Sequence, residues 1–467
     1  MMLTGEAPKP ALDFSDLLSK EGAARHSSNL KDLLKYMSEP DMISLGGGLP
    51  HPSLFPFSAL KAVVPSRAEN ADHCKQEINI QAEQSPKAVA SLSQVLQYGN
   101  GCGTQPFLST VRRITSDLHH PPYADWDVIA SCGNTDAWAK CVGMLCDYDD
   151  WCIMDEWTYP AIMETILPLG IKPLGIEMDG EGMVPEALEK VLEGWNEGVK
   201  GKKPRVVYLI PTGQNPTGVT MSLTRRQSIY ALAQRFNLIL VEDDPYYYLQ
   251  LPPFDPSSTQ LAQPSTPFSY IPSLLSLDTD GRVIRLDSFS KILAPGLRCG
   301  WVTANRRFTS IIQYHNEVTC QQPSGFSQAI LAQLLSENVW GMAGWKRHLE
   351  GIRDEYTRRR NHLLRAVQMH VDPQLAEYVI PSAGMFVWFK IKPLTDGRNR
   401  EVTAEQLFNK FIETGCLLVP GHNFSAERFG DWNNAPYFRA TYANATFEQM
   451  EVAIRRFGNV LKSTFAV

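Results

Sequence analysis

The chain has 467 residues, of which 43% are hydrophobic and 20% are charged, a composition typical of a globular protein rather than a disordered one. Its 44 basic and 50 acidic residues give a net charge of −6, which argues against nucleic acid as the main partner. No apolar run approaches the roughly 18 residues of a membrane span. Nine cysteines, without zinc-ligand spacing, favour free thiols in a reducing cytosol. We therefore expect a soluble, cytoplasmic enzyme or large binding protein without a metal, a nucleic acid or a membrane as partner.

The N-terminal part of the chain is predicted to be largely irregular. Residues 1–45 form a polar arm with a short amphipathic helix at 30–37. The next stretch, 44–57, is dense in Gly and Pro, which favour turns over regular elements. Residues 65–93 are polar, and we expect loop and surface helix there.

From residue 126 onward, apolar runs alternate with helical periods. The predicted strands are 127–131, 151–155, 205–210, 238–243 and 282–287. A helix is predicted at 135–147, and another carries Ile229, Leu232, Ala233 and Phe236 on one face. Continuous apolar strands separated by helices indicate a parallel sheet covered on both faces. Residues 251–273 are rich in Pro and Ser and predict a long loop.

After about residue 325 the pattern changes to long helices and a strand at 385–390. The last helix has an apolar face made of Phe447, Met450, Ile454, Phe457, Val460 and Leu461. The predicted fold class is α/β, with a mostly parallel central sheet flanked by helices in a large domain and a smaller α+β domain. We predict an arm at 1–60 that packs with the small domain, a large domain at 61–330 and a small domain at 331–467.

Polar residues follow several of these strands, where ligands of open α/β sheets bind. Asn134 and Thr135 open the helix after the first strand, and Asn134 is a good N-cap residue for an anion-binding helix start. The turn at 211–218, which contains Asn215, is a weak signal because turns favour these residues.

Asp243 and Asp244 end a buried strand, where a carboxylate is costly without a partner. Adjacent residues of a strand point in different directions, so we expect one of the two to fix a loop and the other to face a cation or a protonated ring.

Residues 288–301 are the most informative stretch of the sequence. Ser288 and Ser290 precede Lys291, and Arg298 follows seven residues later. Apolar neighbours lower the pKa of a lysine and make it nucleophilic, and two hydroxyls with an arginine suit a phosphate dianion. A ligand with a phosphate, a protonated ring nitrogen and an aldehyde satisfies all these groups. That ligand is pyridoxal 5′-phosphate (PLP).

The sequence also resembles the fold-type I PLP-dependent aminotransferases, and within them the fungal aromatic-amino-acid and the 2-aminoadipate/kynurenine aminotransferases. The stretches that carry the resemblance are SLGGGLPHPSLFPF, LQYGNGCGT, IPTGQNPTGV, VEDDPYYYLQ, DSFSKILAPGLRCGW, PSAGMFVWF and PYFRATYA. The spacing from Asn215 to Asp243 is 28 residues, Tyr246 follows three residues later, and Lys291 lies 48 residues after Asp243. This order and spacing are far more specific than any single motif.

The resemblance implies a role for each matching position. Lys291 would be the Schiff-base lysine and the proton-transfer base, and Asp243 would pair with the pyridinium nitrogen. Asn215 and Tyr246 would hydrogen-bond the phenolic oxygen, and Tyr159 would stack on the ring. The phosphate would be held by Ser288, Ser290, Arg298, Asn134 and Thr135. Tyr98 would reach the phosphate of the neighbouring subunit of a homodimer.

On the substrate side, the resemblance implies that Arg439 clamps the α-carboxylate, with Gly48 and Asn215 also in contact with the amino acid. Two positions depart from the family pattern. Asn134 and Thr135 stand where relatives often carry Ser and Gln, and Lys31 is the nearest basic residue where some 2-aminoadipate enzymes use an arginine. The second departure favours aromatic substrates over dicarboxylates.

The expected function is transfer of the amino group of Phe, Tyr or Trp to a 2-oxo acid such as 2-oxoglutarate, by a ping-pong mechanism. The alternatives are a 2-aminoadipate or kynurenine aminotransferase, or another PLP reaction on the same scaffold: a C–S lyase, a decarboxylase or a biosynthetic cyclase. These reactions share the lysine, aspartate and arginine. A metabolite-sensing regulator is a further alternative, but we expect it to need a DNA-binding module longer than the residues before Ser44.

Overall fold

The structure is a computed structural model that describes residues 7–29, 31, 33, 36, 39, 41–43, 45–68, 74–85, 88–256, 269–392, 395, 401–427 and 436–465. The contacts divide the chain into two units. The first unit comprises Met1–Asp147, Ile239–Pro245 and Ser273–Glu350, and the second comprises Tyr148–Leu238, Tyr246–Pro272 and Gly351–Val467. The predicted helix at 30–37 and the middle of the predicted loop at 251–273 fall largely outside the described residues.

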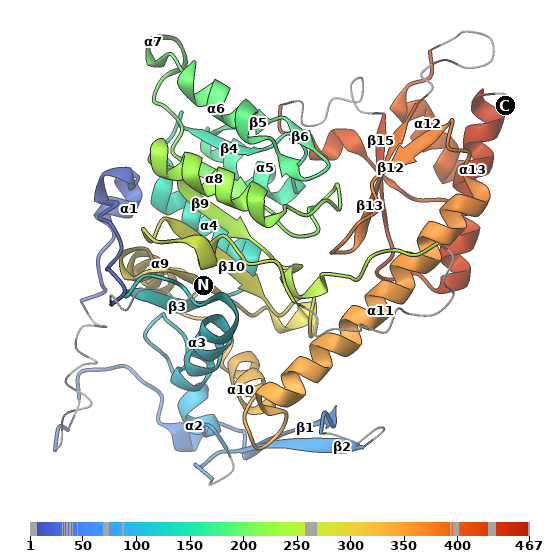
Figure 1. Ribbon diagram of the computed structural model, residues 1–467. Coiled ribbons are helices and arrows are strands. Elements are labelled where there is room, and N and C mark those ends of the chain that lie inside the picture. The colour runs from blue at the N-terminus through green and yellow to red at the C-terminus, as the bar shows by residue number, and fades with distance from the viewer. Residues whose placement is uncertain are drawn as a thin grey trace. The chain divides into compact units, whose positions relative to one another are not determined.

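The first unit contains four strands of the central sheet in the order β3-β11-β10-β9. Strands β3, β9 and β10 are labelled in Figure 1. They are β3 (Trp126–Ser131), β9 (Ile239–Asp243), β10 (Val283–Ser288) and β11 (Gly300–Asn305). Strands β9 and β10 are parallel, whereas β11 runs antiparallel to both β10 and β3. The sequence predicts β3, β9 and β10, and these are confirmed, but β11 and its reversed direction are not predicted.

The hairpin of β1 (Ala59–Pro65) and β2 (Lys75–Gln81) corrects the prediction of loop and surface helix at 65–93. Among the described residues of that stretch, helix occurs at its end, where the short α2 (Leu92–Val95) begins. The other helices of this unit are α1 (Lys20–Ala24), α3 (Gln105–His119), α4 (Asn134–Leu145), α9 (Arg306–Val318) and α10 (Gly325–Leu334). Helix α11 (Gly341–His370) begins in this unit.

The N-terminal arm is partly described and contacts the first unit. Ala11 N donates to Asp125 Oδ1 over 2.6 Å, and Ser19 Oγ donates to Gly143 O over 2.6 Å. The ring of Phe14 stacks on Phe308 with 5.9 Å between centroids. The division of the chain at 1–60, 61–330 and 331–467 stays a prediction.

The second unit contains the parallel strands β8-β4-β5. They are β4 (Trp151–Asp155), β5 (Lys172–Ile176) and β8 (Val206–Leu209), which confirms the strands predicted at 151–155 and 205–210. The short strands β6 (Met178–Asp179) and β7 (Gly182–Met183) form a small hairpin. The helices are α5 (Pro160–Ile166), α6 (Pro185–Glu193), α7 (Glu197–Lys200) and α8 (Leu223–Arg235), and α6 lies beside α8 (Figure 1).

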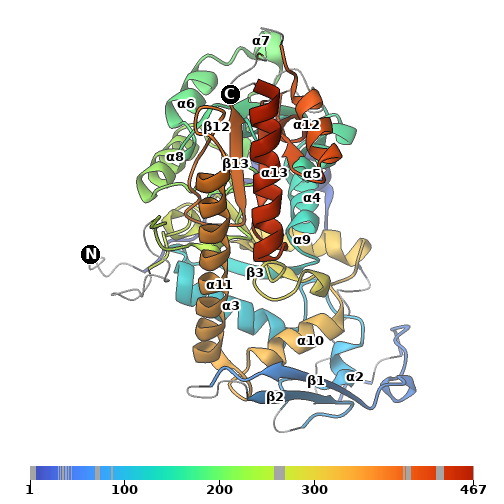
Figure 2. The same ribbon diagram turned by 90° about the vertical axis from the view of Figure 1, so that its right-hand side faces the viewer.

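The C-terminal part of the second unit is an antiparallel sheet backed by helices. Its strand order is β12-β13-β15-β14, from β12 (Ala376–Tyr378), β13 (Phe386–Ile391), β14 (Val419–Pro420) and β15 (Tyr437–Thr441). Helices α12 (Ala404–Glu413) and α13 (Phe447–Phe465) complete it, and Figure 2 shows α13 and α11 side by side against β13. One apolar core joins Val367, Phe389, Phe411 and Phe457. Strand β13 confirms the strand predicted at 385–390.

In the part of the chain that the structure describes, no helix combines the length and the apolar character needed to cross a bilayer.

Candidate active site

The start of helix α4 is a helix N-terminus without a side-chain cap. Gly133 is the N-cap residue, at φ 101°, and no side chain accepts from the first turn. The prediction that Asn134 caps this helix is wrong. Its Nδ2 instead donates to Asp243 Oδ1 over 2.6 Å and to Leu286 O over 3.0 Å, so the residue ties the helix start to β9 and β10. The uncapped N–H groups and the helix dipole leave this end suited to an anion.

Ser288, Ser290 and Arg298 form a connected group beyond the end of β10. Ser288 Oγ donates to Ser290 Oγ over 2.8 Å, and Arg298 Nη1 lies 3.4 Å from the same Ser290 oxygen. Arg298 Nη2 donates over 2.7 Å to the carbonyl oxygen of Cys132, just before the α4 start. The guanidinium therefore links the serine turn to the helix start.

Two backbone features allow Arg298 to take this place. Arg298 itself adopts a left-handed conformation, at φ 47°, which costs free energy in a residue with a Cβ. At Gly133 a Cβ would lie 2.6 Å from Arg298 Nη2, so only glycine permits the approach. Among the described residues, no carboxylate forms an ion pair with Arg298, so its positive charge is available to an anion.

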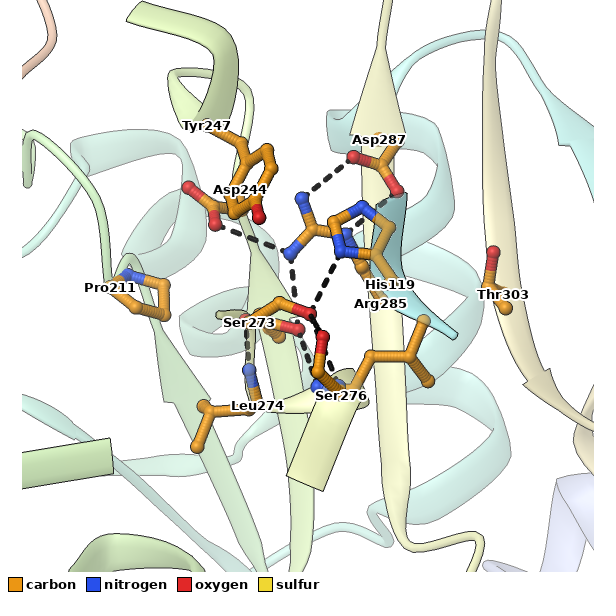
Figure 3. A network of polar contacts seen from close by, with 12 residues as sticks. His119, Pro211, Asp244, Tyr247, Ser273, Leu274, Ser276, Arg285, Asp287 and Thr303 are labelled. Atoms are coloured by element: carbon orange, nitrogen blue, oxygen red, sulfur yellow. Dashed lines mark hydrogen bonds and ion pairs between the residues drawn. The ribbon is translucent and has the colours of Figure 1, made fainter. Parts of the chain in front are cut away.

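Asp243 and Asp244 point to different partners, as the sequence predicts for adjacent strand residues. Asp243 accepts from Asn134, whereas Asp244 Oδ2 lies 3.2 Å from Arg285 Nη1 (Figure 3). Arg285 also pairs with Asp287 and Glu242, and none of these four side chains has any exposed surface. Asp244 is thus the structural carboxylate, and Asp243 is the one bound to the neutral amide at the helix start.

Lys291 is half-buried in the turn that follows Ser290. The backbone directly after it is fixed by His348, whose Nε2 lies 2.8 Å from Ile292 O. Burial lowers the pKa of His348 to about 4, although the bond to Ile292 opposes this shift. The neutral ring therefore donates from Nε2, while its Nδ1 lies 3.1 Å from Arg67 Nη2 and accepts from it. The sequence reasoning missed both residues because nothing local marks them.

In the second unit, Arg439 on β15 meets Asn215 in the turn after β8. Arg439 Nη1 donates to Asn215 Oδ1 over 2.6 Å. The guanidinium carbon lies 4.3 Å from the ring centre of Phe386 and 4.8 Å from that of Phe424. Burial lowers the pKa of Arg439, which stays protonated because the ordinary value is so high. The result is a desolvated cation that has neutral partners.

Tyr159 and Tyr246 belong to the same group in the second unit. Both lie close enough to Arg439 to oppose the fall of its pKa. The Tyr246 ring also meets Phe386 edge to face, with 5.7 Å between centroids. Tyr159 is the N-cap residue of α5.

A second buried carboxyl supports the Asn215 turn. Gln214 Nε2 donates to Asp155 Oδ2 over 3.2 Å and to Trp157 O over 2.5 Å. Burial raises the pKa of Asp155 to about 7, against the lowering effect of Gln214. Asp155 Oδ1 has no hydrogen-bond partner among the described residues. The sequence reasoning did not single out Asp155 or Gln214.

The remaining predicted site residues lie in the first unit and are exposed. Tyr98 has 60% of its surface exposed, and Lys31 Nζ lies 6.0 Å from its ring centre. Lys31 also donates to Gly99 O. Gly48 and Thr135 are exposed as well.

The structure thus brings the predicted residues together in two groups. The first unit joins Asn134, Asp243, Ser288, Ser290 and Arg298, with Lys291 in the next turn. The second unit joins Tyr159, Asn215, Tyr246 and Arg439. Within the described residues, neither Tyr98 nor Gly48 contacts either group.

The first group fits the phosphate and ring of PLP by the chemistry of its donors. It offers a cation without a carboxylate partner, two hydroxyls and an uncapped helix start to a dianion. It also offers the Asp243 carboxylate to a protonated ring nitrogen. Asn134 Oδ1 is buried and has no hydrogen-bond partner among the described residues, so this place can accept a further polar group. The fold and these donors define a PLP-dependent enzyme.

Known proteins place the chain more closely. Residues 74–457 match the family model described as aminotransferase class I and II. An aromatic amino acid aminotransferase of Schizosaccharomyces pombe is 37% identical over 470 residues, covering 97% of this chain and 98% of that protein. An L-tyrosine:2-oxoglutarate aminotransferase of Serpula lacrymans is 36% identical, covering 89% of this chain and 84% of that protein.

The solved structure of aminotransferase Aro8 from Candida albicans has a TM-score of 0.88 at 33% identity, and covers 98% of this chain and 100% of that one. The chain belongs to the class I and II aminotransferases, and it is a PLP-dependent aminotransferase with the mixed, mostly parallel sheet of that fold. The predicted family, fold class, enzyme type and cofactor are confirmed.

Proposed function

We propose that this aminotransferase takes the amino group from an aromatic L-amino acid and passes it to a 2-oxo acid such as 2-oxoglutarate. The observation that carries the proposal is the setting of Arg439, a desolvated cation held by Asn215 between the rings of Phe386 and Phe424. A cation of this kind suits an α-carboxylate, and the surrounding rings suit an aromatic side chain. The names of the two relatives described above support the same substrate class.

We propose that the two groups of residues bind different parts of the cofactor and substrate. Arg298, Ser288, Ser290 and the α4 start, with Asn134 and Thr135, hold the phosphate. Asp243 keeps the ring nitrogen protonated, and Asn215 and Tyr246 hydrogen-bond the phenolic oxygen. Tyr159 stacks on the ring, and Arg439, with Gly48 and Asn215, binds the substrate carboxylate.

PLP supplies an electron sink for the pair of electrons left on the substrate Cα when its proton departs. Lys291 Nζ would be the base that takes that proton and later gives it back, and Ser288, Ser290 and Arg298 would hold the phosphate in place. Arg439 orients the amino acid, so that the Cα–H bond rather than the bond to the carboxylate stands ready to break.

The decisive experiment is a donor and acceptor panel. L-Phe, L-Tyr and L-Trp with 2-oxoglutarate should yield the matching 2-oxo acid and glutamate in equal amounts. Faster turnover of L-kynurenine or L-2-aminoadipate would move the proposal to the alternative substrate class. Release of ammonia with pyruvate, or of CO2, would replace transamination by another PLP reaction.

The Lys291→Ala variant tests the lysine assignment. It should lose all turnover and the visible absorbance of the bound cofactor, because no amine is left to bond the PLP aldehyde and move the proton. Lys346→Ala, on α11, is a control that should keep both. Activity in the Lys291 variant would remove that residue from its role.

We also propose a cytoplasmic homodimer in which Tyr98 contacts the phosphate of the neighbouring subunit. The exposed ring of Tyr98 supports a role at a subunit contact. Mixing Tyr98→Ala and Lys291→Ala proteins under subunit exchange should restore part of the activity, because one site of each mixed dimer keeps both residues. A lack of restored activity in verified mixed dimers would place Tyr98 in its own subunit's site.

A further inference from the structure

Two cysteines lie together in the first unit beside a buried lysine. Cys132 follows β3, and Cys320 lies just beyond α9, and their thiols are joined by a hydrogen bond. Lys140 Nζ lies 3.8 Å from Cys320 Sγ and 2.6 Å from Asp136 Oδ2. Asp136 Oδ2 also accepts from Cys132 N over 2.9 Å. One charged pair on α4 therefore contacts both cysteines.

The two thiols have different proton affinities. The hydrogen bond from Cys132, together with the Lys140 charge, lowers the pKa of Cys320 to about 6, against the effect of burial. The same hydrogen bond, with burial, raises the pKa of Cys132. The two shifts have opposite directions, so Cys320 is the more acidic thiol of the pair and Cys132 holds its proton more tightly. A thiolate is the nucleophilic form of cysteine.

The other thiols offer a contrast. Burial raises the pKa of Cys102 and Cys299 to about 12 and that of Cys416 to about 11. Of the cysteines in the described residues, Cys74 and Cys320 are the exposed ones. Cys320 thus combines exposure, a neighbouring cation and a second thiol within reach, which are the features of an oxidant-sensing cysteine.

We propose that Cys320 and Cys132 form a reversible disulfide when the protein meets a peroxide, with Cys320 as the reacting thiol and Cys132 as the resolving one. The Cys320 thiolate attacks one peroxide oxygen, the O–O bond breaks, and with one proton the products are a sulfenic acid and water. Cys132 then attacks the Cys320 sulfur, the S–O bond breaks, and a second water leaves with the thiol proton. Peroxide gains the two electrons that the two thiols lose.

The disulfide would form within one residue of the proposed phosphate site. The carbonyl oxygen of Cys132 accepts from Arg298, and Gly133 is the N-cap of α4. The disulfide itself does not depend on the proposed substrate, so thiol chemistry tests it separately from catalysis.

The experiment treats the reduced, full-length holoenzyme with hydrogen peroxide at pH 7 and counts the remaining free thiols. Two thiols should be lost, and a non-reducing digest should contain the Cys132 and Cys320 peptides joined, with the mass of two hydrogens missing. Dithiothreitol should restore both thiols. Cys320→Ser should lose the reaction, whereas Cys74→Ser, the other exposed cysteine, should keep it. Oxidation of Cys320 without the crosslink, or no thiol loss, overturns the proposal.

The rate at which iodoacetamide alkylates Cys320 tests whether Lys140 activates this thiol. Lys140→Gln should slow the alkylation of Cys320 by iodoacetamide at pH 6.5 by about threefold, because a rise of about one unit in the Cys320 pKa lowers its thiolate fraction at that pH from about three quarters to about one quarter. Lys140→Arg should retain the rate. If Lys140→Gln does not fold, the pH dependence of the Cys320 alkylation rate in the wild-type protein tests the proposal instead. An inflection near pH 6 supports the proposal, and one near the ordinary value of about 8.5 overturns it.

Discussion

Strand β10 and the loop after it carry two arginines in opposite settings. Arg285 has no exposed surface and contacts three carboxylates, with Asp287 bound through both of its oxygens (Figure 3). Burial alone would lower the pKa of Arg285, and the carboxylates outweigh it and raise the pKa well above the ordinary value. Arg298 is exposed and is held by carbonyl and hydroxyl oxygens.

The difference separates charges that hold the fold from charges that await a ligand. A buried ion surrounded by counter-charges cannot change partner without a large desolvation cost. An ion that is positioned by neutral groups keeps its field for an incoming ion of opposite sign. By this criterion Arg439, with Asn215 and two aromatic rings, belongs with Arg298 although it is largely buried.

The largest expected effect is on stability, from Arg285→Met. Three carboxylates would stay buried without their cation, so the free energy of unfolding should fall by about 3–5 kcal/mol. Urea denaturation of the apo protein measures the change. Arg306→Met, an exposed arginine at the start of α9, is the control and should lie within about 0.5 kcal/mol of wild type. A loss below about 1 kcal/mol for Arg285→Met would deny the structural role.

Asp155 extends the comparison to an acid, because it is buried with an amide partner rather than a cation. Its raised folded pKa, about 7, means that the native state retains a proton that the unfolded state loses above about pH 4. This contribution to stability is present at low pH and is lost as the pH rises to 7. Between pH 5 and 8, wild type should therefore lose about 2–3 kcal/mol relative to Asp155→Asn, measured by urea denaturation. Parallel pH profiles of the two proteins would contradict the shifted pKa.

The sequence pattern alone was sufficient to predict a strand where every residue of that strand is buried. The runs at 238–243 and 282–287 predicted β9 and β10, because a short, uninterrupted apolar run is typical of a strand that is buried on both faces of a sheet. Strand β2 was missed because it buries only Ile78 and Ile80, with polar residues between them. Alternation over so short a length is hard to distinguish from a polar loop.

The predicted site residues were found by their order and spacing, but their partners depend on long-range pairing. Apart from the family resemblance, the residues alone could not say which of Asp243 and Asp244 is the structural carboxylate, because that follows from the register that sets Arg285 beside Glu242. The contacts of His348 with Ile292 and of Cys320 with Cys132 join residues 56 and 188 positions apart. No local pattern encodes such contacts.

Arg439→Lys tests the arginine that is largely buried yet has neutral partners. The lysine keeps the charge but loses the paired donors that match a carboxylate, so binding of the amino acid should weaken by about 1.5–3 kcal/mol. The dependence of the single-turnover rate on amino-acid concentration measures it, with Lys390→Arg on the neighbouring strand as a control. An unchanged concentration dependence would exclude Arg439 from substrate binding.

Arg298→Met should have the smallest effect on stability and a specific effect on the cofactor. Arg298 is exposed and has no carboxylate partner in the part of the chain that the structure describes. Its removal therefore leaves no buried charge behind, and the free energy of unfolding of the apo protein in urea should change by less than about 1 kcal/mol. The affinity for PLP should nevertheless fall by about 1–2 kcal/mol, because a charge-assisted bond to the phosphate is lost. Titrations with PLP and with pyridoxal, which has no phosphate, separate a lost phosphate contact from general damage to the site. The variant should bind PLP more weakly than wild type does, but it should bind pyridoxal equally well. If the variant instead loses as much stability as Arg285→Met, the two arginines do not differ in the way their partners indicate.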